Sequence, residues 1–292
     1  MDSQSSFEKS PIDDTEDISI IFKELAKTQL SSVYLAKNFR TNDIVVWKKL
    51  NNVKQFRNEC KMLKKVKHSD YFVKILGEFM NKTEPVIILE YMEGPTLTHY
   101  IHKTHILPFS KVLEISLELF SAIDYLEKLS ILHRDIKPDN IFTSSTNQDF
   151  TVKLGDFGLS TKYCPSKKRT GFYGTLLYMA PEVILESDHT FGMDIWSLGV
   201  TIFNLVTTKY PFSQSCNSSQ QIMNNITSAA YPSKNKMISK IRKIFLMNPI
   251  QAIQSVIIVK RFYPLFEQIF TIAPQIRLTA SEAIVILEGL KN

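Results

Sequence analysis

Residues 133–140 read His133-Arg134-Asp135-Ile136-Lys137-Pro138-Asp139-Asn140, and this stretch decides how the rest of the chain is interpreted. Two further motifs follow it along the chain, Asp156-Phe157-Gly158 and then Ala180-Pro181-Glu182. A lone aspartate in a loop is normally a cap or a turn residue. An eight-residue segment with acidic, basic and amide side chains, followed in order by two more motifs, is much more specific than any one of its members.

The three motifs together resemble the catalytic loop, the metal-binding loop and the end of the activation segment of protein kinases. The resemblance implies transfer of the γ-phosphate of ATP to a protein hydroxyl, which depends on positioning and charge neutralisation. Asp135 would orient the hydroxyl and take its proton, and Lys137 would balance charge on the moving phosphoryl group. Asn140 and Asp156 would supply the oxygen ligands that Mg²⁺ prefers. ATP and Mg²⁺ are therefore the expected cosubstrate and metal, bound in the cleft of the fold.

Upstream residues complete the nucleotide site that the resemblance implies. Lys48 ends the run Val45–Lys48, which is similar to the kinase strand whose lysine holds the α- and β-phosphates. Glu59 lies on the predicted helix that follows and is the expected partner of Lys48, although both residues could instead be solvated charges among many lysines. The other expected ATP-binding residues are Ala26, Val33, Val46, Glu90, Met92 and Phe142.

The hydrophobic pattern predicts a sheet-rich part followed by a helical part. Four β-rich runs predict strands, at 33–36, 44–47, 73–79 and 86–90. Apolar residues at helical spacing predict helices over 56–66 and 111–128. The nearly all-apolar stretch 193–207 predicts a buried helix.

These elements favour an α+β fold class, the bilobal protein-kinase fold with a small β-rich N-lobe and a larger helical C-lobe. The expected N-lobe covers about 18–91 and the expected C-lobe about 92–292. Residues 1–17 are Ser-rich and acidic, which predicts a flexible N-terminal tail.

Three internal contacts follow from the resemblance. Asp194 is expected to be a buried carboxylate tied to the catalytic-loop backbone, and Arg277 is expected to pair with Glu182. An internal column that links the lobes is expected from His133, Phe157, Leu63 and Ile75.

The segment over the phosphates departs from the kinase pattern G-x-G-x-x-G-x-V. Aligned on Val33, the segment reads Ala26-Lys27-Thr28-Gln29-Leu30-Ser31-Ser32-Val33, so all three glycines are absent. Glycines at these positions normally let backbone amides approach the phosphates closely. This departure keeps a second hypothesis open, a pseudokinase that acts as a binding or scaffold module.

The first motif and the segment that leads to the third motif indicate the substrate class and a mode of regulation. Lys137-Pro138 and the run Gly174–Glu182 resemble serine/threonine kinases, in which Thr175 would contact Asp135 and Lys137. Arg134 would receive a phosphate from the activation segment, with Thr170 preferred over Ser166 and Tyr173 as the phosphorylated residue. The expected partners are protein substrates and an upstream kinase, unless the segment is phosphorylated by the chain itself.

Composition excludes several other classes. The 35 basic and 29 acidic residues give a formal charge of +6, too mild an excess to indicate nucleic acid binding. The three cysteines, Cys60, Cys164 and Cys216, form no close pair, which fits a reducing, intracellular compartment, cytoplasmic or nuclear. No membrane-spanning run and no membrane partner are expected. The basic stretch within 234–262 reads either as a docking helix for an acidic partner or, by preference, as a helix of the lobe.

Overall fold

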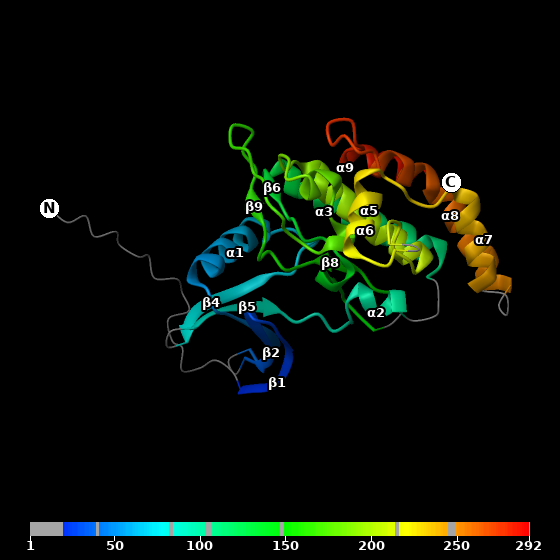
Figure 1. The fold of residues 1–292 in the computed structure, drawn as a ribbon. Helices are drawn as coiled ribbons and strands as arrows, with labels where there is room; N and C mark the ends of the chain where they lie inside the picture. The colour runs from blue at the N-terminus through cyan, green and yellow to red at the C-terminus, as the bar shows by residue number, and fades with distance from the viewer. Residues whose placement is uncertain are drawn as a thin grey trace. The chain divides into compact units, whose positions relative to one another are not determined.

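The computed structural model describes residues 20–38, 41–81, 84–102, 107–146, 149–213, 216–244 and 249–291 (Figure 1). The predicted tail over 1–17 lies outside these residues. The chain divides into two compact units. The N-terminal unit consists of Met1–Lys67 with Lys74–Tyr91, and the C-terminal unit consists of His68–Val73 with Met92–Asn292.

The N-terminal unit is built on an antiparallel sheet of five strands in the order β1-β2-β3-β5-β4. The strands are β1 (Ile20–Lys27), β2 (Ser31–Lys37), β3 (Ile44–Leu50), β4 (Ile75–Asn81) and β5 (Glu84–Glu90). Side chains two residues apart on a strand lie on the same face, as Val45 and Trp47 do on β3 and Val86 and Ile88 do on β5. That face buries a core formed by Ala36, Val45, Trp47, Val86 and Ile88.

One helix, α1 (Val53–Val66), accompanies the sheet in this unit. The side chain of Asn52 begins it by accepting hydrogen bonds from the amides of Lys54 and Gln55, which satisfies two donors of the first turn. Its buried face includes Glu59 as well as apolar side chains. The predicted strand over 73–79 starts two residues later than expected, because the amide of Val73 donates to Leu154 in the C-terminal unit.

The C-terminal unit is mainly helical (Figure 1). Its longer helices are α3 (Phe109–Lys128), α5 (Phe191–Thr207), α6 (Ser219–Thr227), α7 (Lys234–Ile244), α8 (Pro249–Ile269) and α9 (Ala280–Gly289). Two shorter ones are α2 (Leu97–His102) and α4 (Pro181–Ile184). Two small antiparallel pairs complete the unit, β6 (Ile131–Leu132) with β9 (Thr161–Lys162) and β7 (Ile141–Thr143) with β8 (Val152–Leu154).

Helix α5 forms the core of the C-terminal unit, as the sequence predicts. Almost every side chain from Met193 to Thr207 is buried. The ring of Trp196 stacks on Phe212 with centroids 5.0 Å apart, and Phe203 packs against Phe266 on α8 at 5.3 Å. Trp196 and Phe203 are seven residues apart, so this aromatic packing supplies a large buried area along one side of the helix.

The predicted α+β class is confirmed by the sheet of one unit and the helices of the other. The segment 234–262 forms helix α7 and most of α8, which pack against each other (Figure 1). Met237 on α7 is buried, as a helix of the lobe requires. Within the described part of the chain, no helix combines the length and the apolar character needed to cross a membrane.

Candidate active site

The catalytic loop connects β6 to β7 in the C-terminal unit and contains the 3-10 turn Pro138–Asn140. The carboxylate of Asp194, on α5, accepts hydrogen bonds from the backbone amides of His133 at 2.7 Å and Arg134 at 2.9 Å. Burial raises the pKa of Asp194, while His133 and the two amides oppose that change. The predicted link between Asp194 and the backbone of the loop is confirmed.

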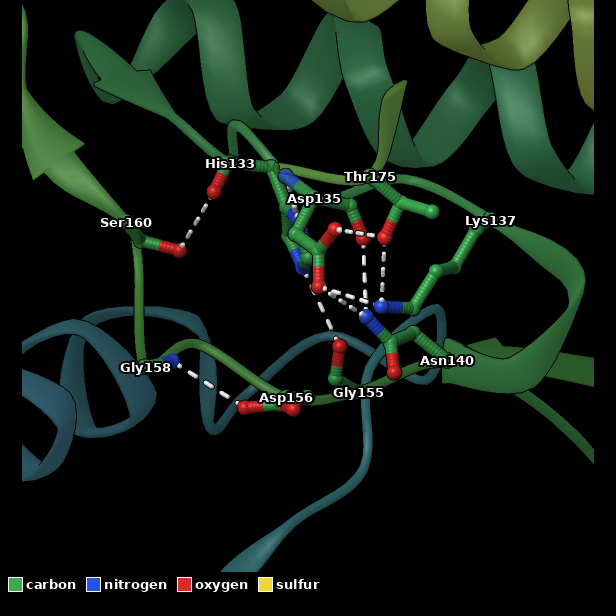
Figure 2. A network of polar contacts seen from close by, with 9 residues as sticks. All are labelled: His133, Asp135, Lys137, Asn140, Gly155, Asp156, Gly158, Ser160 and Thr175. Carbon is green, nitrogen blue, oxygen red and sulfur yellow. Dashed lines mark hydrogen bonds and ion pairs between the residues drawn. The ribbon is translucent and has the colours of Figure 1, made fainter. Parts of the chain in front are cut away.

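Asp135 lies at the centre of a network of polar side chains (Figure 2). Its Oδ2 atom lies 2.9 Å from Nζ of Lys137 and accepts a hydrogen bond from Nδ2 of Asn140 at 3.1 Å. Its Oδ1 atom accepts a hydrogen bond from the hydroxyl of Thr175 at 3.2 Å. Nζ of Lys137 donates to the same hydroxyl at 2.9 Å. The predicted contacts of Thr175 are thus confirmed, and the 12% exposed carboxylate of Asp135 is held in one orientation.

The two predicted metal ligands, Asn140 and Asp156, come from loops that are bonded to each other. The amide nitrogen of Asn140 donates to the carbonyl oxygen of Asp135 at 2.8 Å, so its amide oxygen points away from Asp135 (Figure 2). The backbone carbonyl of Asn140 accepts a hydrogen bond from the amide of Gly155 at 2.9 Å. This bond holds the residue before Asp156 against the catalytic loop.

The donor set of this loop pair suits a hard cation. In the described residues, no group of three or more His, Cys, Asp or Glu could hold a metal ion. One carboxylate and one amide oxygen match Mg²⁺, which typically keeps several waters and binds through one or two protein groups plus phosphate oxygens. The assignment of Asn140 and Asp156 as ligands stays a prediction.

The segment Asp156–Gly158 turns at its first residue. Asp156 has a left-handed backbone with φ of 58°, whereas Gly158 does not have a positive φ. The amide of Gly158 donates to Oδ1 of Asp156 at 3.2 Å, which supports this conformation (Figure 2). The left-handed residue of this turn is therefore Asp156 and not the glycine.

Phe157 is fully buried between two rings of its own unit. Its ring centroid lies 5.0 Å from that of His133 and 5.7 Å from that of Phe72. The predicted contact between His133 and Phe157 is confirmed, and Phe72 is a neighbour that the sequence did not identify. Leu63 and Ile75, the other predicted members of this column, belong to the N-terminal unit.

The N-terminal unit contains a buried ion pair between β3 and α1. Nζ of Lys48 lies 2.6 Å from Oε1 of Glu59, and the two side chains are 10% and 1% exposed. These are not two solvated charges, the alternative that the sequence left open. A buried ammonium held by one carboxylate has a fixed position, which a phosphate-binding lysine requires.

The other predicted nucleotide residues are distributed over both units. Ala26 on β1 pairs with Val33 on β2, and Val46 on β3 pairs with Leu89 on β5. Glu90 ends β5. Met92 and Phe142 belong to the C-terminal unit, where Phe142 lies on β7 opposite Lys153. Their role in binding ATP stays a prediction.

Comparison with known proteins agrees with this arrangement of residues. A model of the protein kinase domain matches residues 21–285. The chain belongs to the protein kinase domain family. The resemblance and the fold predicted from the motifs are thereby confirmed.

Several curated kinases are similar to this kinase domain. The chain is 31% identical over 227 residues to "Mitogen-activated protein kinase kinase kinase ANP1" of Arabidopsis thaliana, an alignment that covers 77% of the chain and 33% of that protein. It is 32% identical over 200 residues to "Aurora kinase" of Schizosaccharomyces pombe, which covers 66% and 55%. It is 34% identical over 206 residues to "Serine/threonine-protein kinase STE20" of Eremothecium gossypii, which covers 67% and 21%. The kinase domain thus spans between about a fifth and just over half of these relatives.

The turn between β1 and β2 is closed without any glycine. The hydroxyl of Thr28 accepts hydrogen bonds from the amides of Leu30 at 3.2 Å and Ser31 at 3.0 Å, and it donates to the carbonyl of Ser31 at 3.2 Å. Asn51 holds the other side of the turn, where its side chain donates to the carbonyl of Gln29 at 2.8 Å. The amides that a glycine-rich loop would offer to phosphate are engaged within the turn. The sequence did not identify this contact, although a threonine side chain commonly bonds to backbone amides two or three residues further on.

The activation segment contacts Arg134 through an aromatic ring. The guanidinium of Arg134 lies 4.3 Å from the ring centroid of Tyr173, and its Nε donates to the carbonyl of Leu159 at 2.7 Å. Thr170, the predicted phosphorylation site, is exposed, as is Lys162. The role of Thr170 stays a prediction.

The predicted pair between Glu182 and Arg277 is confirmed. Both nitrogens of the guanidinium fork bind the carboxylate, Nη1 to Oε1 at 2.7 Å and Nη2 to Oε2 at 3.0 Å. The side chains are 3% and 0% exposed, and Arg277 also lies over the ring of Trp196. This bidentate, buried geometry anchors the end of the activation segment to the helical unit.

Proposed function

We propose that this kinase domain is an active serine/threonine protein kinase that transfers the γ-phosphoryl group of ATP to a hydroxyl of a protein substrate. The observation that carries the proposal is the network around Asp135, whose carboxylate contacts Lys137, Asn140 and Thr175 (Figure 2). Phosphoryl transfer requires a group that orients the hydroxyl and a cation beside it, and Asp135 and Lys137 can fill these two roles.

Each side chain has a distinct part in this proposal. Asp135 accepts a hydrogen bond from the substrate hydroxyl and takes its proton as the oxygen attacks. Lys137, 2.9 Å from Asp135, stabilises the negative charge that develops on the phosphoryl group. Asn140 and Asp156 would hold Mg²⁺, which supplies further charge neutralisation. Lys48, fixed by Glu59, would hold the α- and β-phosphates.

Two observations favour serine and threonine over tyrosine as substrates. Lys137 contacts Thr175, so the two residues that resemble the serine/threonine class are part of one network with Asp135. Relatives named "Serine/threonine-protein kinase STE20" and "Serine/threonine-protein kinase ATG1b" align with 67% and 66% of the chain. Physiological substrates and any upstream kinase are further parts of the proposal.

A pseudokinase is the alternative that the glycine-free turn had kept open. Against it, all of the acidic and basic residues of the reaction are retained, and those within each unit contact one another as the reaction requires. A binding module has no need of a buried lysine held at 2.6 Å from a glutamate or of a lysine beside Asp135.

A transfer assay tests the proposal directly. The purified chain is incubated with γ-labelled ATP, Mg²⁺ and a peptide library in which the acceptor is serine, threonine or tyrosine. We expect label on serine and threonine peptides, and its loss in Asp135→Asn. Equal incorporation by Asp135→Asn would overturn the proposal, as would a preference for tyrosine peptides or no transfer by folded wild-type protein.

A further inference from the structure

Tyr173 makes a contact in the activation segment that the catalytic motifs do not explain. Its ring covers the guanidinium of Arg134 at 4.3 Å from the ring centroid. On another side, the ring of His189 meets it edge-on, with centroids 6.1 Å apart and an interplanar angle of 87°. The second anchor of Arg134 is the carbonyl of Leu159, which accepts from Nε at 2.7 Å. Arg134 is thus held between a backbone carbonyl and an aromatic face.

The backbone around Tyr173 is shaped to allow this contact. Gly171 and Gly174 have φ of 121° and 98°, which residues with a side chain rarely adopt. A Cβ atom at Gly171 would lie 2.8 Å from the ring of Tyr173. A Cβ atom at Gly174 would lie 2.8 Å from the carbonyl oxygen of Arg134. Gly174 therefore permits close packing of this segment on Arg134, and Gly171 leaves room for the ring of Tyr173.

The contact between Tyr173 and Arg134 lies close in sequence to the residues that react. Arg134 precedes Asp135, and Tyr173 lies two residues before Thr175. Thr175 in turn donates to Oδ1 of Asp135 at 3.2 Å. The ring and the guanidinium therefore fix the relative register of the two backbone stretches that carry this hydrogen bond.

The surroundings of Arg134 are those of a site for an anion, yet an aromatic face is in contact with it. Burial lowers the pKa of Arg134 and the nearby Arg169 adds to that change, whereas Tyr173 opposes it, in part by accepting a side-chain hydrogen bond. A phosphate on Thr170 is the anion that the sequence predicts here. The face of an aromatic ring attracts a guanidinium through its quadrupole and needs no modification to do so.

We propose that Tyr173 is a positioning residue that clamps Arg134 and so holds the Thr175–Asp135 hydrogen bond without a phosphate on Thr170. This inference rests on the proposed kinase activity. It predicts that the chain can transfer phosphate without being phosphorylated itself. It also predicts that the aromatic face of Tyr173, rather than its hydroxyl, holds Arg134 in place.

The test compares Tyr173→Phe, Tyr173→Leu and Tyr173→Ala with the wild-type protein, all treated with phosphatase. Phe172→Ala is the matched control, because Phe172 is the adjacent aromatic residue and is 51% exposed. We expect Tyr173→Phe to keep kcat/KM for a peptide within about twofold. Tyr173→Leu and Tyr173→Ala should lose roughly 2- to 30-fold, the range that a cation–π contact of ordinary strength supports. The KM for ATP should not change, which separates positioning from general damage to the fold.

Three results would overturn the inference. One is a loss in Tyr173→Phe as large as in Tyr173→Ala, which would assign the effect to the hydroxyl. Another is an equal effect of Phe172→Ala. The third is loss of activity in wild-type protein after phosphatase treatment or in Thr170→Ala, which would show that a phosphate is needed.

Hydrogen exchange distinguishes this inference from the proposed function. The amides of residues 171–176 should exchange faster in Tyr173→Leu than in Tyr173→Phe, whether or not the chain transfers phosphate. If the wild-type protein is inactive but this difference is found, the clamp stands and the proposed function fails. If exchange is the same in both variants, the clamp is wrong even in an active enzyme.

Discussion

Thr28 is expected to limit the affinity of this kinase domain for ATP. Its hydroxyl accepts hydrogen bonds from the amides of Leu30 and Ser31, in the turn that covers the phosphates in related kinases. We propose Thr28→Val as the perturbation, because valine has nearly the same shape but cannot accept a hydrogen bond. The turn should persist, since the amide of Thr28 donates to the carbonyl of Ser31 at 2.8 Å and Asn51 holds Gln29.

The size of the effect follows from the bonds exchanged. A neutral hydrogen bond within the turn contributes about 0.5–1.5 kcal/mol, and a bond to a charged group about 1.5–3 kcal/mol. Each amide that turns from Thr28 to a phosphate oxygen should therefore gain roughly 1–1.5 kcal/mol. Since about 1.4 kcal/mol is one decade, the dissociation constant of ATP should fall by roughly tenfold for each amide released. Thr28→Gly combined with glycine at Ala26 and Ser31 should bind at least as tightly.

Calorimetry with two ligands isolates the phosphate contribution. ATP with Mg²⁺ should bind Thr28→Val more tightly than the wild-type protein, whereas adenosine, which has no phosphate, should bind both equally. Thr41→Val is the matched control, because Thr41 is an exposed threonine whose hydroxyl accepts a hydrogen bond from the amide of Asp43 in the next hairpin turn. Unchanged or weaker ATP binding with unchanged adenosine binding would refute the reasoning, since the side chains of the turn would then hold the phosphate.

Three further predictions concern the C-terminal unit. Asp135→Asn should lower kcat by at least about 100-fold, the usual contribution of a positioned base, and Asp156→Asn should also lower kcat because it removes the predicted carboxylate ligand of Mg²⁺. Both variants should keep the circular dichroism spectrum of the wild-type protein, and near-normal turnover in either would contradict its assignment. Glu182→Gln leaves the buried guanidinium of Arg277 without its carboxylate, so the free energy of unfolding measured in urea should fall by about 3–5 kcal/mol. A fall below about 1 kcal/mol would mean that the fold does not need the ion pair. Burial lowers the pKa of His133, so the unfolded chain takes up a proton more readily than the folded one. The free energy of unfolding should therefore fall as the pH drops below about 6.5, and His133→Phe should reduce that fall; identical pH profiles would refute it.

The sequence predicted the contacts of the site that involve residues of the kinase-like motifs. The contacts of Asp194 with the loop and of Glu182 with Arg277 join residues far apart in the chain, and the resemblance of the motifs to protein kinases implied both of them. The pairing of Lys48 with Glu59 was predicted in the same way. A buried ionic group needs a charged or hydrogen-bonding partner, which explains why both members of each pair are present.

The features that the sequence did not identify depend on local conformation. Thr28 closes a turn whose pattern lacks glycine, and its hydroxyl could equally have faced solvent or phosphate. Tyr173 covers Arg134 only because Gly171 and Gly174 adopt positive φ, which a residue name permits but does not dictate. Likewise, Phe72 reaches Phe157 because its backbone pairs with Leu154. In each case the side chain has several physically acceptable partners, and the fold selects one.

Two residues at the centre of the site have conformations that are unfavourable for a side chain. Arg134 and Asp156 have φ of 69° and 58°, and left-handed geometry costs about 1–2 kcal/mol for a residue other than glycine. Both are offset locally, Arg134 by the bond from its amide to Asp194 and Asp156 by the bond from the amide of Gly158. Asp194 also bears a burial cost, which raises its pKa. The conformation of the loop that contains Asp135 thus depends on Asp194, and the position of Asp194 depends on the buried helix α5. The buried carboxylate of Asp194 therefore helps to orient Asp135, and a contribution to the stability of the fold does not by itself explain why a carboxylate is buried there.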